Sequence, residues 1–247
     1  MKKFALIFAA GKGTRLGEIS QYTPKALIPI NGKPMLWHII NKLSKNGFSQ
    51  IVINVHHLAQ QIIDFVQENP FPGVTIHISH EQEFLADTGG GLKLASHFFQ
   101  SAEHILLHNV DVISDISLQA LYDYHLQNNK LATLAVKNRR TSRYLLFDQN
   151  LHLKGWKNIS TGEQILCSQE ELTPLAFSGI HVISTKMLKL LPQAEVFSMT
   201  KLYLDICSDH SVVGFIHNDD EWIDVGRPEH FEEASRIIKK ITHNDIH

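Results

Sequence analysis

The sequence has few cysteines and no long hydrophobic segment. Its 247 residues include only Cys167 and Cys207, which cannot by themselves build a disulfide framework or a thiolate zinc cluster. No apolar run approaches the ~18 residues that a membrane helix needs. No Ser/Gly/Pro-rich linker and no internal repeat divides the chain. We therefore expect one cytoplasmic domain that does not bind to a membrane.

An excess of charge of one sign is also absent. Lys and Arg number 23, Asp and Glu number 25, and the formal net charge is −2. This balance argues against a general nucleic-acid-binding protein, which needs a basic surface. Hydrophobic residues make up 43% of the chain, which is enough for a folded protein with a sizeable core.

The first ten residues superficially resemble a secretory signal. Two lysines precede the apolar stretch Phe4–Ala10, but that stretch has only seven residues and runs directly into a loop containing Gly, Lys and Arg. A buried first strand over Lys3–Ala9 explains the same residues better.

Short apolar runs alternate with stretches of helical periodicity through the first half of the chain. We expect strands over residues 3–9, 51–55, 74–78, 104–108 and 131–136, with helices from Pro34 to about Gly47, over 58–66 and 91–99, and from Ser117. This order predicts an α/β fold, Rossmann-like, with a mixed, mostly parallel sheet and helices on both faces.

The second half has a different pattern. Residues 144–147 and 151–156 are expected to form short antiparallel strands around a turn at 148–150. Further strands are expected over 177–183, 212–216 and 222–225, and helices over 185–191, 198–207 and 229–241. The whole chain, 1–247, is expected to be a single domain.

A glycine-rich loop, Gly11–Gly17, follows the first expected strand. Glycine lets backbone N–H groups approach an anion closely, and Lys12 and Arg15 add positive charge. The loop fails the Walker A pattern because Leu6 stands where the first glycine is needed. It also misses the dinucleotide-binding pattern, because its third glycine, Gly17, comes one residue late. A surface turn with incidental charge remains an alternative for the loop taken alone.

The loop belongs to a longer pattern. Residues 8–16, 24–29 and 32–34 together resemble the signature of the sugar-1-phosphate nucleotidyltransferases, and so do the later segments 87–91, 109–111, 177–180 and 222–226. The resemblance is nearest to N-acetylmuramic acid 1-phosphate uridylyltransferases and mannose-1-phosphate guanylyltransferases. It implies a nucleotidyltransferase fold, with a nucleotide-binding half over about 1–115 and a sugar-phosphate-binding half over about 116–230.

The resemblance also implies an activity and its residues. The enzyme would transfer a nucleoside monophosphate from a nucleoside triphosphate, with UTP or GTP favoured, to a sugar 1-phosphate, with Mg²⁺ as cofactor. Arg15 and Lys25 would be the catalytic cations, and Asp111 and Asp224 the metal ligands. The implied nucleotide-binding residues are Ala9, Ala10, Gly11, Gly13, Thr14, Asp87, Thr88, Gly89, Gly90 and Asn109, and the sugar-phosphate contacts are Ser178 and Gly179.

Physical reasoning supports the metal pair independently. Asp111 and Asp224 each follow or end an expected strand, and the carboxyl ends of strands in a parallel sheet converge on one crevice. Two carboxylates facing phosphate oxygens suit Mg²⁺. Sixteen histidines are present, but no spacing typical of a metal site is found, so we expect them to be scattered on the surface.

Three segments depart from the family pattern. Val110 stands where the family usually has glycine, residues 17–20 replace the common continuation of the first motif, and residues 154–158 lack the Glu-Lys-Pro pattern of several glucose-1-phosphate enzymes. Two alternatives to the leading hypothesis stay open: a non-catalytic nucleotide-sugar sensor, and a cytidylyltransferase acting on a non-sugar phosphate such as phosphocholine. A nicotinamide-dependent oxidoreductase is disfavoured because Val55-His56-His57 offers no acidic residue for the ribose.

Overall fold

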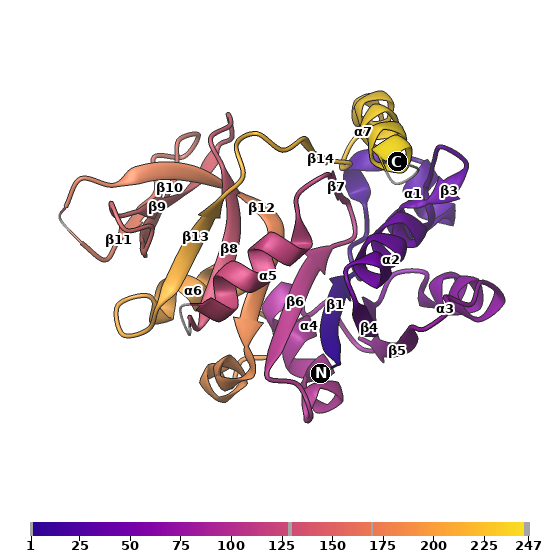
Figure 1. Cartoon of the computed structure of the whole chain (residues 1–247), viewed down its shortest axis with the longest axis horizontal. Coiled ribbons are helices and arrows are strands. Elements are labelled where there is room, and N and C mark those ends of the chain that lie inside the picture. The colour runs from indigo at the N-terminus through magenta and orange to yellow at the C-terminus, as the bar shows by residue number, and fades with distance from the viewer. Residues whose placement is uncertain (1, 128–129, 169, 245–247) are drawn as a thin grey trace.

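The computed structural model describes residues 2–127, 130–168 and 170–244. The main sheet, shown in Figure 1, is built from ten strands within these ranges. They are β1 (Lys3–Phe8), β4 (Phe48–Val55), β5 (Thr75–His80), β6 (His104–Asn109), β8 (Ala132–Lys137), β9 (Arg143–Phe147), β10 (Leu153–Asn158), β11 (Gln164–Leu166), β12 (Thr173–Ser184) and β13 (Val212–Ile216). Two small ribbons pair β2 (Pro29–Ile30) with β3 (Lys33–Pro34), and β7 (Val112–Ser114) with β14 (Trp222–Asp224).

Helices connect most of the strands. The α-helices are α1 (Ile19–Tyr22), α2 (Met35–Lys45), α3 (Ala59–Glu68), α4 (Asp87–Ala95), α5 (Leu118–Gln127), α6 (Met199–Ile206) and α7 (Phe231–Asn244). Short 3-10 turns lie at Thr14–Leu16, Lys25–Leu27, Ser96–Phe99, Thr185–Leu190 and Pro228–His230. None of the helices in the described ranges is long and apolar enough to cross a membrane.

The strand order explains the change of pattern halfway along the chain. Strands β5, β4, β1 and β6 are parallel neighbours, as the repeated β-α units predict. Strand β12 then runs antiparallel to β6, and its two ends pair with β8 and β9. The predicted α/β fold with a mixed sheet is confirmed, and the expected antiparallel strands are β9 and β10.

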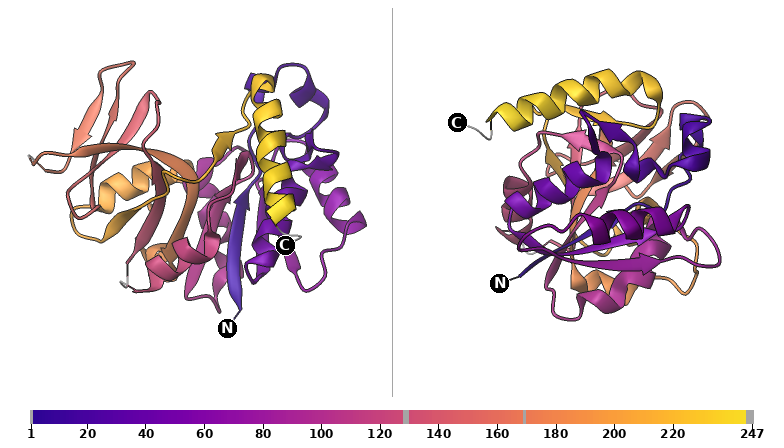
Figure 2. Two further views of the ribbon diagram at one scale, coloured as in Figure 1. Left: turned by 45° about the horizontal axis from the view of Figure 1, so that its top comes forward. Right: turned by 90° about the vertical axis from the view of Figure 1, so that its right-hand side faces the viewer.

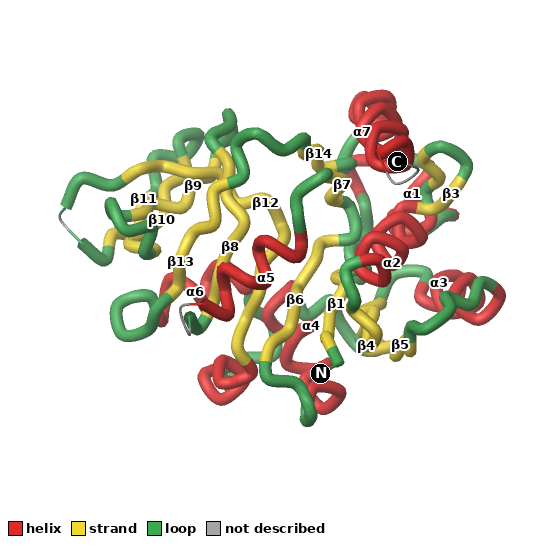
Figure 3. Tube along the Cα trace, in the orientation of Figure 1, coloured by secondary structure: helices red, strands yellow, loops and turns green. Residues whose placement is uncertain are grey.

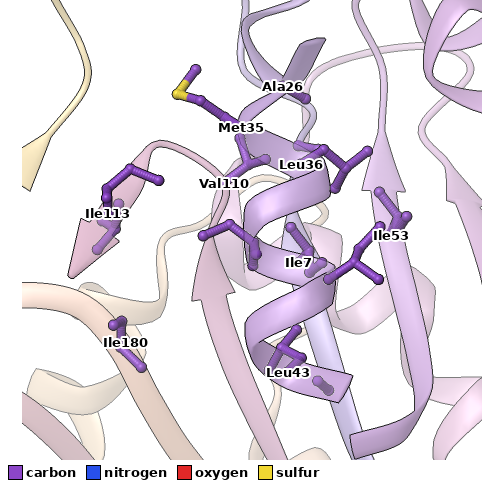
Figure 4. Packing of buried hydrophobic residues seen from close by; sticks show 14 of the residues in the cluster. Ile7, Ala26, Met35, Leu36, Leu43, Ile53, Val110, Ile113 and Ile180 are labelled. Atoms are coloured by element: carbon purple, nitrogen blue, oxygen red, sulfur yellow. The ribbon is translucent and has the colours of Figure 1, made fainter. Parts of the chain in front are cut away.

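A hydrophobic core lies on each face of the sheet, because successive side chains of a strand point to opposite faces. Along β1, Ala5 and Ile7 belong to one core cluster with residues of α2, whereas Leu6 and Phe8 belong to a second cluster with residues of α4 and α6. Figure 4 shows Ile7 and Ile53 of the sheet facing Leu36 and Leu43 of α2. Full burial of each such side chain stabilises the fold by about 1.5–3 kcal/mol.

Helix α2 has the boundaries that the sequence predicts. Pro34 precedes the helix as its N-cap, and proline at such a start sacrifices no helical hydrogen bond. Gly47 follows the helix with a φ of 81°, a left-handed conformation that glycine adopts without strain. The apolar residues between these limits, Met35, Leu36, Ile39, Ile40 and Leu43, are buried against the sheet.

Helix α7 closes one side of the molecule, as Figure 2 shows. Its residues Ala234, Ile237 and Ile238 are buried in the same cluster as α2, and its Ser235 carbonyl accepts a hydrogen bond of 2.8 Å from Asn31. The ribbon β7–β14 lies beside it, with Trp222 paired to Ser114 and Asp224 paired to Val112. The last elements of the chain are thereby fixed against the first half.

The expectation that the histidines lie on the surface is wrong for four of them. His108, His125, His181 and His217 are buried. Each ring has at least one nitrogen with an internal partner, such as the hydroxyl of Tyr203, 2.7 Å from His181 Nδ1. Burial lowers the pKa of His108, His125 and His181 to about 3 and that of His217 to about 4. A neutral imidazole with a hydrogen-bond partner is a core side chain, which residue spacing alone does not reveal.

Candidate active site

The loops after β1 and β6 begin at the same end of the sheet, the carboxyl end of both strands, because the two strands are parallel (Figure 3). They border a pocket of about 300 Å³, which we call the loop pocket. Its walls come from distant parts of the chain and comprise Phe8, Gly11, Gly13, Thr14, Arg15, Lys25, Thr88, Asn109, Val110, Asp111 and Gly226. Seven of the residues predicted to bind nucleotide or act as catalytic cations therefore share one concave surface.

The conformation of the glycine loop depends on Gly13. Its φ of 64° is left-handed, and it caps the 3-10 turn Thr14–Leu16, whose Leu16 is buried. A Cβ at Gly13 would lie 3.3 Å from Cβ of Lys25 and of Ser20, so the glycine allows the loop to pack against the segment that carries Lys25. Gly11 is exposed and has open space around it, whereas Ala9 and Ala10 are buried below the loop.

Lys25 lies between the two predicted metal ligands. Its buried ammonium group forms an ion pair with Asp111, and its Nζ lies 4.0 Å from Oδ1 of Asp224. Arg15 approaches the other oxygen of Asp224 at 3.8 Å. Burial and the nearby Asp111 carboxylate raise the pKa of Asp224, and the cations Lys25 and Arg15 partly offset them. The four side chains thus form one compact charged cluster.

The two carboxylates fit a magnesium ion. Oδ1 of Asp224 is buried without a hydrogen-bond partner, which is costly for a carboxylate oxygen unless another ligand satisfies it. No group of three or more His, Cys, Asp or Glu side chains that could hold a metal is found in the described residues. A cation here would therefore take two protein carboxylates and complete its shell with phosphate and water oxygens, the ligands that Mg²⁺ prefers.

Asp224 reaches the cluster by a different route from the one expected. Asp111 follows β6 of the main sheet, but Asp224 ends β14, which pairs with β7 in a separate two-stranded ribbon. The N–H of Val225 donates to the carbonyl of Asp111 at 2.8 Å and ties the two segments together. A Cβ at Gly226 would lie 2.7 Å from both Arg15 Nη2 and Asp224 Oδ1, so a larger residue there would displace the cluster.

The segment 87–91 differs from its prediction as a loop. Helix α4 begins at Asp87, four residues before the expected start at Gly91. The N–H groups of Gly89 and Gly90 both donate to the carbonyl of Phe197, and a Cβ at Gly89 would lie 2.3 Å from the Phe197 ring. These glycines allow helix α4 to pack closely, and their N–H groups already have acceptors. Thr88 lines the loop pocket, and Asp87 and Thr88 both line a second pocket beside it. The Thr88 hydroxyl accepts a hydrogen bond from the Met199 N–H at 3.0 Å.

A second, larger pocket of about 610 Å³ adjoins the loop pocket and shares Phe8, Thr88 and Asn109 with it. We call it the β12 pocket. Its other walls come mainly from the loop between β8 and β9, from strands β9–β12 and from α6. They include Arg139, Thr141, Arg143, Trp156, Phe177, His181, Met199 and Lys201, and Asp224 also lines the pocket. The cluster of Lys25 and the two aspartates therefore lies where the two pockets meet.

The predicted sugar-phosphate contacts lie behind the β12 pocket. Ser178 is fully buried, and its hydroxyl lies 2.7 Å from His217 Nε2, so its side chain faces the interior and not the pocket. Gly179 has a φ of 73°, and a Cβ there would lie 2.8 Å from Nδ2 of Asn109. The Gly179 backbone thus permits Asn109 to pack against β12, and both residues support the pocket wall.

The sequence alone does not predict the contribution of Arg139 or its contact with Trp222. The Arg139 guanidinium stacks on the Trp222 ring at 4.0 Å from its centroid, and Trp222 Nε1 donates to the carbonyl of Ser178 at 2.8 Å. The signal in the sequence is the pair of arginines Arg139-Arg140, which begins three residues after the strand expected at 131–136.

Val110 borders the loop pocket, but the bulk of its side chain is accommodated in the core. Its side chain is buried in the core cluster beside α2, as Figure 4 shows, and its φ is not left-handed. The residue before Asp111 therefore needs neither the freedom nor the small size of glycine in this chain.

Comparison with known proteins agrees with this geometry. The nucleotidyl transferase family matches residues 4–241. A UTP–glucose-1-phosphate uridylyltransferase of Synechocystis sp. is 27% identical over 250 residues, covering 95% of this chain and 63% of the relative. A D-glycero-α-D-manno-heptose 1-phosphate guanylyltransferase of Aneurinibacillus thermoaerophilus is 26% identical over 248 residues, covering 95% of this chain and 98% of the relative.

The chain spans about 60% of the length of the first curated relatives that it matches. Among solved structures, HddC from Yersinia pseudotuberculosis complexed with GMP-PN has a TM-score of 0.74 with 22% identity. The likeness covers 95% of this chain and 98% of that chain and supports the fold. With the family match extending over nearly all of the sequence, the chain belongs to the nucleotidyl transferase family.

Proposed function

We propose that this chain transfers a nucleoside monophosphate from a nucleoside triphosphate to a sugar 1-phosphate. The observation that carries the proposal is the position of Lys25, between Asp111 and Asp224 at the junction of two pockets. A two-substrate reaction needs two adjoining sites with the reacting charges neutralised between them. The named activities of the uridylyltransferase and guanylyltransferase relatives support the same reaction.

In this reaction an oxygen of the acceptor phosphate forms a bond to the α-phosphorus of the triphosphate. The bond from that phosphorus to the bridging oxygen of the leaving pyrophosphate breaks, and a nucleotide sugar forms. Negative charge moves onto the pyrophosphate, so the protein contributes mainly by positioning and by electrostatic stabilisation.

The chain's own residues divide this work. Backbone N–H groups of Gly11 and Gly13 would bind phosphate oxygens, and the exposed Arg15 would reach the triphosphate with its planar guanidinium. Lys25, buried and held by Asp111, would keep its charge directed at the reacting phosphate. Asp111 and Asp224 would hold Mg²⁺, which when bound neutralises and orients the phosphate oxygens.

A pyrophosphate-release assay tests the proposal. UTP, GTP, CTP and ATP are each combined with N-acetylmuramic acid, mannose and glucose 1-phosphates and with phosphocholine, with and without Mg²⁺. We expect release with at least one sugar 1-phosphate, with UTP or GTP preferred, and loss of release when Mg²⁺ is chelated. Release with phosphocholine alone would favour the non-sugar cytidylyltransferase, and binding without any release would favour the sensor.

Two variants and a matched control test the cluster. Asp111→Asn and Asp224→Asn each remove a carboxylate charge without changing shape and should reduce release by at least ~100-fold, the scale of one lost electrostatic contact in a transition state. Asp219→Asn makes the same change at an exposed aspartate outside both pockets and should be neutral. Near-normal release in both cluster variants would contradict the metal assignment.

A further inference from the structure

The β12 pocket is lined by three basic side chains that have no role in the proposed reaction as described above: Arg139, Arg143 and Lys201. They differ in environment. Lys201 is exposed and forms an ion pair with Asp205 on the same helix, and Arg143 is exposed at the start of β9. Arg139 alone of these three is partly buried. Removing a cation from water costs free energy unless partners in the protein or a bound ligand compensate for it.

Two protein contacts fix the Arg139 guanidinium in place. It stacks on Trp222, and its Nη2 donates to the carbonyl of Phe177 at 2.9 Å. The Trp222 ring is itself fixed by its hydrogen bond to Ser178. A guanidinium held in one plane loses little conformational freedom when it binds a ligand, so this side chain is prepared for binding.

Its hydrogen-bonding capacity is only partly used by the protein. Arg139 Nε is buried and has no acceptor, although a guanidinium offers five N–H donors. Burial lowers the pKa of Arg139, and the negative charge of Asp224 opposes that effect. Because arginine keeps its proton in proteins, an unsatisfied, partly desolvated cation of this kind is stabilised by an anion.

We propose that Arg139 binds the phosphate group of the sugar 1-phosphate acceptor. This inference rests on the proposed function. Arg15 and Lys25 line the loop pocket, whereas Arg139 lines the β12 pocket together with Asp224. The acceptor phosphate must lie beside Asp224 to attack the triphosphate, and its two negative charges need a cation there. The planar fork of a guanidinium matches the oxygens of a phosphate.

The test compares Arg139→Gln, Arg139→Lys and the matched control Arg140→Gln, whose side chain is exposed and outside both pockets. We expect Arg139→Gln to raise the KM for the sugar 1-phosphate about 10- to 100-fold, the cost of losing a charge-assisted hydrogen bond. The KM for the triphosphate should change less than about twofold. Arg139→Lys should recover part of the loss, and Arg140→Gln should behave as the unmodified chain.

An equal rise in both KM values, or an unchanged acceptor KM, would overturn the assignment. Circular dichroism and thermal melting of each variant exclude misfolding as the cause, and Arg139→Lys provides a charged variant if Arg139→Gln does not fold. If Arg143→Gln, and not Arg139→Gln, raises the acceptor KM selectively, the phosphate is bound at the pocket rim and the inference is wrong.

A binding measurement separates this inference from the proposed function. Calorimetry compares mannose 1-phosphate with mannose, and glucose 1-phosphate with glucose, on the unmodified chain and on Arg139→Gln. We expect the phosphate to strengthen binding to the unmodified chain and to lose about 10- to 100-fold of that advantage in the variant. This result would support Arg139 even if no triphosphate pair releases pyrophosphate. No preference for the phosphorylated sugars in the unmodified chain would overturn the inference.

Discussion

The four buried histidines make the stability of this protein sensitive to mild acid. His108, His125, His181 and His217 stay neutral in the folded chain because burial lowers each pKa to about 3 or 4. In the unfolded chain a histidine has a pKa of about 6.5. Between these values the unfolded state binds protons and the folded state does not, so the free energy of unfolding falls as the pH falls below about 6.5.

The size of the effect follows from the same values. On going from pH 7.0 to pH 5.5, each buried histidine lowers the free energy of unfolding by about 1.2 kcal/mol, and the four together by about 5 kcal/mol. This is comparable to the whole stability of many domains, about 5–15 kcal/mol. Lys42, whose pKa burial lowers to about 7, acts mainly above pH 7 and adds only about 0.4 kcal/mol in the same direction within this window.

Urea unfolding followed by circular dichroism at several pH values between 7.0 and 5.5 measures the slope. His125→Gln, which removes one titrating group while retaining a side chain that can bond to Thr133, should lower the slope by about one proton. His210→Gln changes an exposed histidine and should leave the slope unaltered. A total change below about 1 kcal/mol across this range would show that these histidines are not kept neutral by folding.

Three further predictions concern particular residues. Gly90→Ala places a Cβ 2.1 Å from the carbonyl oxygen of Glu195 and should lower the free energy of unfolding, measured by urea titration, by about 1–3 kcal/mol. Gly11→Ala adds a Cβ in open space and should not lower it. Equal losses in the two variants would contradict the packing argument. Asp224→Asn should not lower the melting temperature in calorimetry, because burial and Asp111 already disfavour the charged carboxylate; a large decrease would mean that the ion pairs outweigh the repulsion. Ser178→Ala should leave the KM for the sugar 1-phosphate within about twofold while destabilising the fold by about 1 kcal/mol, since it removes the partner of His217; a selective rise in KM would restore Ser178 as a sugar contact.

The sequence predicts the parallel part of the sheet well, because its signals are local. Buried strands such as β1 appear as continuous apolar runs, and α2 carries both a start signal at Pro34 and a stop signal at Gly47. The glycine loop and Lys25 are also contiguous enough to be recognised as one pattern. These features need no knowledge of distant contacts.

The remaining features depend on contacts between residues far apart in the sequence. Gly89 and Gly90 resemble a ligand-binding loop until the Phe197 carbonyl is known to accept their N–H groups. Ser178 resembles a surface contact until His217 is found beside it. Arg139 is recognised as a pocket residue only when its stacking on Trp222 and its proximity to Asp224 are known. In each case the partner lies at least 39 residues away, and no local pattern identifies it.

The ribbon β7–β14 determines when, during synthesis of the chain, the charged cluster around Lys25 can be assembled. A chain emerging from the ribosome presents the glycine loop, Lys25 and Asp111 early, but the second carboxylate arrives only with Asp224. Until β14 pairs with β7, the nascent chain carries the cations and a single carboxylate. The charged cluster is therefore completed only after residue 224 has been synthesised and β14 has paired with β7.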